Sequence, residues 1–267
     1  MDVGLSTLLY IWKTSLKDAI SRIASFGYDG IEIRAGEPDA SAKRLKSKDR
    51  RALKKIIESN GLKVYSLTPD WGDLNLASSN PAMREESVRQ VKEAIELEAD
   101  LGGEYFTILP GRRYMISAPP LETCREWSLD SLTECVNLAE KLNVTLCLEG
   151  APGQVIVKEE DLLQTVKEID SRNLQLTADT SHAYIVSDPP TYFRKIGNYI
   201  GIVHIADNDG TPNSHLPPGL GKVDFESAFK ALRDVGYRGH YLLEIWYPEN
   251  PEWAAEQSKI FIKKHIS

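Results

Sequence analysis

The sequence has few cysteines and no long apolar run, and these two shortages exclude several classes of protein. Only Cys124, Cys135 and Cys147 are cysteines among 267 residues, and none of them forms a spaced pair typical of a zinc knuckle or a redox motif. We therefore expect free thiols in a reducing compartment, the cytoplasm. No stretch approaches the roughly 18 apolar residues of a membrane span. The start, MDVGLSTLLYIWK, lacks the basic leader and the apolar length of a secretory signal.

An excess of basic charge is also missing. There are 32 Lys and Arg residues against 39 Asp and Glu residues, a formal net charge of −7. An acidic surface repels phosphate backbones, so we expect no nucleic-acid partner. The remaining composition, 42% apolar and 27% charged residues, is typical of a globular protein with a large core.

Short apolar runs rich in β-branched and aromatic residues recur along the chain, as expected of strands buried on both faces. There are eight, at Val3–Tyr10, Gly30–Arg34, Lys63–Thr68, Glu104–Leu109, Thr145–Glu149, Leu174–Ala178, Ile200–Ala206 and His240–Trp246. Their starts are about 34 residues apart on average, the length of one strand–helix unit.

Segments with helical periodicity separate these strands. They are Leu16–Phe26, Arg51–Glu58, Met83–Leu101, Leu129–Leu142, Lys158–Ile169 and Phe225–Val235. Gly27, Gly61, Gly102 and Gly236 follow helical segments, as glycines that end helices do. Eight alternating units without a linker predict an α/β fold, one (β/α)8 barrel domain over residues 1–267. An open doubly wound sheet is the alternative, but no G-x-G-x-x-G follows the first strand.

Polar side chains with metal-binding groups lie at the ends of four consecutive predicted strands. Glu149 ends the fifth strand, Asp179 follows the sixth, and His204 and Glu244 lie near the ends of the seventh and eighth. Each alone is typical of a solvated loop residue or a satisfied structural polar group. Together they would lie at one rim of the barrel, where carboxylates would repel one another unless a cation united them. Oxygen ligands with one nitrogen suit Mn, Co, Mg or Zn.

Several motifs, in the same order, resemble the sugar isomerase/epimerase family with the xylose-isomerase-like barrel. That family includes ketose 3-epimerases, hydroxypyruvate isomerases, inosose dehydratases and, more remotely, nucleases of the endonuclease IV type. The matching segments are GYDGIEI (27–33), CLEG (147–150), ADTSH (178–182), VHIAD (203–207), PPGLGKVDF (217–225) and GYRGHYLLE (236–244).

The resemblance implies one divalent ion, with manganese favoured, held by Glu149, Asp179, His204 and Glu244. It implies that Glu149 and Glu244 also exchange protons with the substrate, and that His182 of the D-x-x-H motif contacts a substrate oxygen. One position departs from the ketose 3-epimerase pattern: Gly210 stands six residues after His204, where that branch usually has arginine. The resemblance also leaves a homodimer or a homotetramer open.

Four further residues are candidates for substrate binding. Glu32 ends the second strand and is equally typical of a structural hydrogen bond. His215 lies on the long loop after the seventh strand and could reach substrate or metal. Arg112 and Trp246 follow or end the fourth and eighth strands, where a solvated arginine and ordinary aromatic packing are the alternatives. Asp207 is expected to orient His204 or a loop.

These residues predict a metal-dependent isomerase or epimerase that acts on a ketose or a related small polyhydroxy carbonyl compound. A carboxylate would remove the proton beside the carbonyl, and the ion would stabilise the resulting enediolate. A dehydratase of the inosose or dehydroshikimate type shares that first step and is the alternative. An endonuclease IV-like phosphodiesterase is disfavoured, since no histidine precedes His182. A barrel that binds without catalysis would be expected to have an incomplete ligand set.

Overall fold

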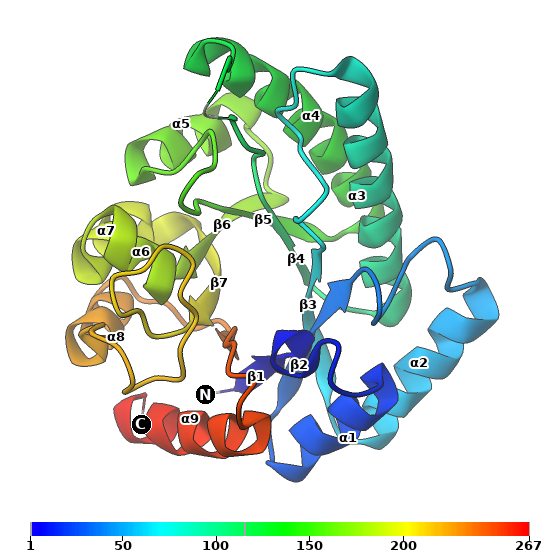
Figure 1. The fold of residues 1–267 in the computed structure, drawn as a ribbon, viewed down its shortest axis with the longest axis vertical. Coiled ribbons are helices and arrows are strands. Elements are labelled where there is room, and N and C mark those ends of the chain that lie inside the picture. The colour runs from blue at the N-terminus through cyan, green and yellow to red at the C-terminus, as the bar shows by residue number, and fades with distance from the viewer. Residues whose placement is uncertain (1, 115, 267) are drawn as a thin grey trace.

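The computed structural model describes residues 2–114 and 116–266, and these contain a closed barrel in which each strand pairs with its sequence neighbours and β8 pairs with β1. Every pairing is parallel, and Figure 1 shows the strands around the centre with the helices outside them. The predicted (β/α)8 barrel is confirmed. The strands are β1 (Val3–Ser6), β2 (Gly30–Ala35), β3 (Lys63–Pro69), β4 (Tyr105–Ile108), β5 (Thr145–Glu149), β6 (Leu174–Asp179), β7 (Ile200–Ile205) and β8 (Tyr241–Leu243).

The helices of the described residues follow the strands around the ring. They are α1 (Leu16–Ser25), α2 (Ser47–Ser59), α3 (Pro81–Leu101), α4 (Leu121–Leu142), α5 (Glu159–Ile169), α6 (Thr180–Val186), α7 (Pro189–Ile196), α8 (Phe225–Asp234) and α9 (Pro251–His265), with short 3₁₀ turns at Thr7–Tyr10 and Gly197–Tyr199. The six helical segments expected from periodicity are present. The helices α6, α7 and α9 were not predicted, and α2 and α4 begin earlier than expected.

Local signals explain where α1 and several other helices begin and end. The Ser15 hydroxyl accepts a hydrogen bond from the Asp18 amide at 3.2 Å and caps α1. Ala19, Ile20 and Ile23 form the buried face of that helix. The four glycines expected to end helices all have left-handed backbone, with φ from 72° to 80°.

Four strands are shorter than predicted, β1, β4, β7 and β8, and the first and last differ most. The first ends at Ser6, whose hydroxyl accepts from the Leu8 amide at 3.3 Å and starts a 3₁₀ turn over the rest of the predicted strand. The last strand ends at Leu243. Glu244 therefore lies one residue beyond β8, and its amide still donates to the Ile205 carbonyl of β7 at 3.1 Å.

The barrel interior is apolar over part of its depth. Tyr65, Cys147, Ile202 and Leu242 form a buried cluster there, with Tyr105 packed against it. Gly30 leaves room for the Tyr65 ring, because a Cβ on Gly30 would lie 2.3 Å from that ring. The larger core lies between the strands and the helices. Among the described residues, no helix combines the length and the apolar character needed to cross a membrane.

Candidate metal centre

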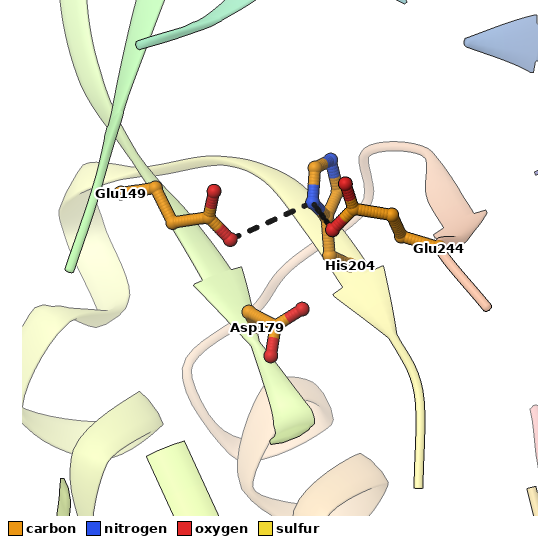
Figure 2. Close-up of side chains that lie close together, drawn as sticks. All are labelled: Glu149, Asp179, His204 and Glu244. Atoms are coloured by element: carbon orange, nitrogen blue, oxygen red, sulfur yellow. Dashed lines mark ion pairs between the residues drawn. The ribbon is translucent and has the colours of Figure 1, made fainter. Parts of the chain in front are cut away.

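Four ligand-type side chains converge at the carboxyl ends of β5 to β8. Glu149 and Asp179 are the last residues of β5 and β6, His204 lies on β7, and Glu244 follows β8. All four are buried, and one potential ligand atom from each lies within 4.8 Å of the others. Figure 2 shows the three carboxylates and the imidazole directed toward a common region. The structure thus brings together the residues that the strand positions had singled out.

The His204 imidazole lies at the centre of this cluster. Its Nδ1 is 3.2 Å from Glu244 Oε2 and 3.7 Å from Glu149 Oε1; Figure 2 marks both interactions. Its other ring nitrogen, Nε2, faces the opposite way, toward Glu32 Oε2 at 3.2 Å. One imidazole nitrogen is therefore available to a ligand between the two glutamates.

The donor set fits a single divalent cation. Glu149 Oε1, Asp179 Oδ2 and His204 Nδ1 are buried and have no hydrogen-bond partner among the described residues, although buried polar atoms are normally satisfied. An ion bonded at about 2.1 Å would place opposite ligands about 4.2 Å apart. Ligand atoms that already lie within 4.8 Å of one another need only a small inward movement to reach such an ion.

Proton affinities in the cluster are shifted by burial and by neighbouring charges. Burial disfavours the charged carboxylate of Glu149, but the His182 and His204 imidazoles outweigh it and lower its pKa. Burial, reinforced by repulsion from Glu149 and Glu244, raises the pKa of Asp179. Burial opposes a charged His204, yet Glu32 and Glu244 raise its pKa well above the ordinary value. Protons on the imidazoles thus offset carboxylate charge that a cation would otherwise neutralise.

Two further histidines extend the cluster. His182, in α6, places Nδ1 3.3 Å from Glu149 Oε1, and His215, on the loop after β7, places Nδ1 2.8 Å from the Glu244 carbonyl oxygen. A carbonyl only accepts, so His215 donates from Nδ1 and can accept at Nε2 from His182 Nε2, 3.3 Å away. Burial lowers the pKa of His182, but Asp179 and Glu149 outweigh it and raise it to about 9. Both histidines, which the sequence predicts to bind substrate, thus lie beside the four-residue cluster.

The loop between β7 and α8 is anchored by Asp207. Its buried carboxylate accepts hydrogen bonds from four backbone amides, those of Asn208, Gly219, Gly221 and Val223, at 2.8–3.0 Å. Its own amide donates to the Leu216 carbonyl, and the Leu216 amide donates back. Of the two roles expected for Asp207, the structure shows the orientation of the loop. This loop carries His215 to Glu244.

We expect Asp207→Asn to loosen this loop and to reduce stability. The NH₂ group of asparagine cannot accept the hydrogen bonds that the backbone amides donate to the Asp207 carboxylate. Each buried donor left without an acceptor costs about 1–3 kcal/mol. Urea unfolding should show the loss of stability, and hydrogen exchange should show loss of protection in residues 208–223. Asp209→Asn is the matched control, because Asp209 is exposed on the same loop and accepts only locally, from the Thr211 amide at 2.9 Å. Equal protection in both variants would contradict the anchoring role.

The remaining predicted substrate-binding residues lie in different surroundings. The Glu32 side chain is completely buried against His204. The Arg112 guanidinium donates to the backbone carbonyls of Trp71 and Gly72, the latter at 2.8 Å, and so holds the loop after β3. Trp246 is 39% exposed.

Sequence reasoning missed two features of this centre. The contact between Glu32 and His204 joins β2 to β7, and its only signal was an acid between the apolar residues Ile31 and Ile33. The amides that converge on Asp207 are backbone groups, which no side-chain motif reveals. The first contact touches His204 directly, and the second holds the loop that carries His215 to Glu244.

Comparisons with known proteins agree with the fold. Residues 20–265 match the family model described as the xylose isomerase-like TIM barrel. Fructoselysine 3-epimerase from Shigella flexneri is 27% identical over 91% of this chain and 90% of its own length. L-ribulose-5-phosphate 3-epimerase UlaE from Salmonella paratyphi C is 26% identical over 91% of this chain and 87% of its own length. The crystal structure of a D-tagatose 3-epimerase-like protein superposes with a TM-score of 0.86 at 27% identity, covering 100% of this chain and 97% of that one.

The fold and the comparisons define an enzyme of the sugar isomerase/epimerase type. The chain belongs to the xylose isomerase-like TIM barrel family.

Proposed function

We propose that this protein is a divalent-metal-dependent epimerase acting on a ketose or a related small polyhydroxy carbonyl compound. Glu149, Asp179, His204 and Glu244 would hold the ion, and manganese is the favoured metal. When bound, the ion supplies Lewis-acid stabilisation of the negative charge that develops on the substrate oxygens as an enediolate forms. The buried, unpartnered ligand atoms of the cluster support the metal site.

The placement of two glutamates on either side of His204 Nδ1 carries the proposal. Glu149 comes from β5 and Glu244 follows β8, and each directs a carboxylate oxygen toward that nitrogen. One carboxylate would take the proton from the carbon beside the carbonyl, while the C–H electrons move onto the carbonyl oxygen. The other would first take up a proton from an imidazole in contact with it and would return that proton to the opposite face, which inverts the carbon centre. The lowered pKa of each glutamate keeps the base ionised at neutral pH.

The imidazoles beside the glutamates would bind substrate. His182 and His215 lie in contact with the two glutamates and with each other, so a substrate oxygen could replace His215 Nε2 as the acceptor of the His182 Nε2 proton. Arg112 and Trp246 remain candidates for substrate contacts, as the sequence predicted. Inversion is preferred to dehydration because the similar fructoselysine and L-ribulose-5-phosphate enzymes are named 3-epimerases.

Three further parts of the proposal concern the protein as a whole. We propose a cytoplasmic location, which the free, buried thiols of the three cysteines support. Residues 1–267 would act as one barrel domain. Assembly as a homodimer or a homotetramer stays a prediction, to be tested by light scattering.

Deuterium exchange tests the shared first step without knowledge of the product. The protein is treated with chelator and then incubated in heavy water with D-tagatose, L-ribulose or fructoselysine, with and without Mn²⁺. We expect the proton signal at C3 to disappear from at least one ketose only when the ion is restored, and the C3 epimer to form alongside. Co²⁺, Mg²⁺ and Zn²⁺ in parallel samples rank the metals. Exchange that continues at the same rate in chelator would contradict the metal requirement, and a panel without exchange would contradict the ketose assignment.

A further inference from the structure

Glu32 is a completely buried acid that the proposed reaction does not use. It comes from β2, between Ile31 and Ile33, and its side chain has no exposed surface. Neither carboxylate oxygen makes a hydrogen bond within residues 2–114 and 116–266. An ionised carboxylate in such surroundings is costly unless it is paired.

The group facing Glu32 is the imidazole of His204. Glu32 Oε2 lies 3.2 Å from His204 Nε2, and His204 is also completely buried. The two residues come from strands that are not neighbours, since β8 and β1 lie between β7 and β2 around the ring. The contact therefore crosses the barrel interior, on the side of the imidazole away from Glu149 and Glu244.

The two ring nitrogens of His204 need different protonation states. An ion ligand at Nδ1 must offer a lone pair, so the ring proton must then reside on Nε2. A carboxylate placed at Nε2 accepts that proton in a hydrogen bond and fixes both the tautomer and the ring orientation. Histidine ligands in proteins commonly have such an outer partner, which also makes the ring a stronger donor to the metal.

We propose that Glu32 is a positioning residue that holds His204 with Nδ1 free and directed at the ion site, in place of the substrate contact predicted from its strand position. This inference rests on the proposed function, because it presupposes the ion. It assigns Glu32 no contact with substrate.

Metal affinity measures this role independently of turnover. Glu32→Gln keeps the shape of the side chain and removes its charge, and we expect Mn²⁺ to bind about 10–100-fold more weakly, as for other outer partners of metal ligands. Calorimetry, or the electron paramagnetic resonance signal of free Mn²⁺, gives the affinity. Glu159→Gln is the matched control: Glu159, on α5, is also buried, but its carboxylate pairs with Lys195 Nζ at 2.6 Å and lies outside the ligand cluster. Its affinity should equal that of the wild type.

A measurement on the wild type does not depend on how the variant folds. In the Zn²⁺-loaded protein with ¹⁵N-labelled histidine, NMR should show His204 with a proton on Nε2 and none on Nδ1. A proton on Nδ1 instead, or equal Mn²⁺ affinity in Glu32→Gln and the wild type, would overturn the positioning role.

The outcomes separate this inference from the proposed function. A wild type that binds Mn²⁺ but exchanges no ketose proton contradicts the reaction and leaves the Glu32 test intact. Normal exchange combined with undiminished Mn²⁺ affinity in Glu32→Gln contradicts the role of Glu32 alone.

Discussion

Glu149→Gln and Glu244→Gln, made separately, each lower the rate of epimerisation by about 10²–10⁴-fold, the usual contribution of a positioned acid or base. A glutamine keeps the volume of the side chain and one oxygen ligand, but its amide cannot take up a proton at neutral pH. The rates are compared at saturating Mn²⁺, so that weaker ion binding is not mistaken for lost proton transfer. Glu249→Gln is the control, because Glu249 is exposed five residues beyond Glu244 in the sequence, and its rate should match the wild type.

A comparison of the deuterium-exchange rate with the epimerisation rate shows which glutamate acts as base and which as acid. A variant that still exchanges the C3 proton for deuterium but forms no epimer retains the base for one face and lacks the acid for the other. Opposite patterns in the two variants, obtained with the two epimers as starting material, would show that each glutamate serves one face. Near wild-type epimerisation in both variants would contradict the proton-transfer roles.

Much of the barrel and its cluster could be predicted because both follow from strand periodicity. A strand buried on both faces is a short apolar run, so all eight were visible in the sequence. A parallel barrel collects the ends of its strands at one rim, so the sequence alone predicts that Glu149, Asp179 and His204 meet.

What escaped prediction depends on contacts between distant segments or on local backbone signals. The helix α6 has only seven residues and begins where Asp179 caps it by accepting from the His182 amide, so its segment resembled a loop carrying site residues. The helices α7 and α9 begin with proline, which is compatible with a first helical turn but also with a loop. The partner of His204 lies in β2, 172 positions earlier in the chain, and no spacing rule reports such a contact.

We expect Asp179→Asn to be less stable than the wild type with Mn²⁺ but at least as stable without the ion. In chelator the variant should be at least as stable as the wild type. Burial and the neighbouring Glu149 and Glu244 raise the pKa of Asp179, so its charge is unfavourable in the metal-free cluster and asparagine removes it. Asparagine caps a helix as well as aspartate does, so the hydrogen bond from the His182 amide, 2.6 Å in the wild type, should persist. Thermal unfolding in chelator measures this half of the prediction.

With Mn²⁺ the order inverts, because the ion stabilises only the protein that binds it. At 100 times its dissociation constant the ion adds about 2.7 kcal/mol, which raises the wild-type Tm by about 5–10 °C for a chain of this size. The variant offers a neutral oxygen in place of a carboxylate, binds the ion more weakly and gains much less. Asp188→Asn is the control, since Asp188 caps α7 outside the cluster by accepting from the Thr191 amide; it should show the wild-type shift with Mn²⁺. An equal Mn²⁺ shift in Asp179→Asn and the wild type would mean that Asp179 is not a ligand.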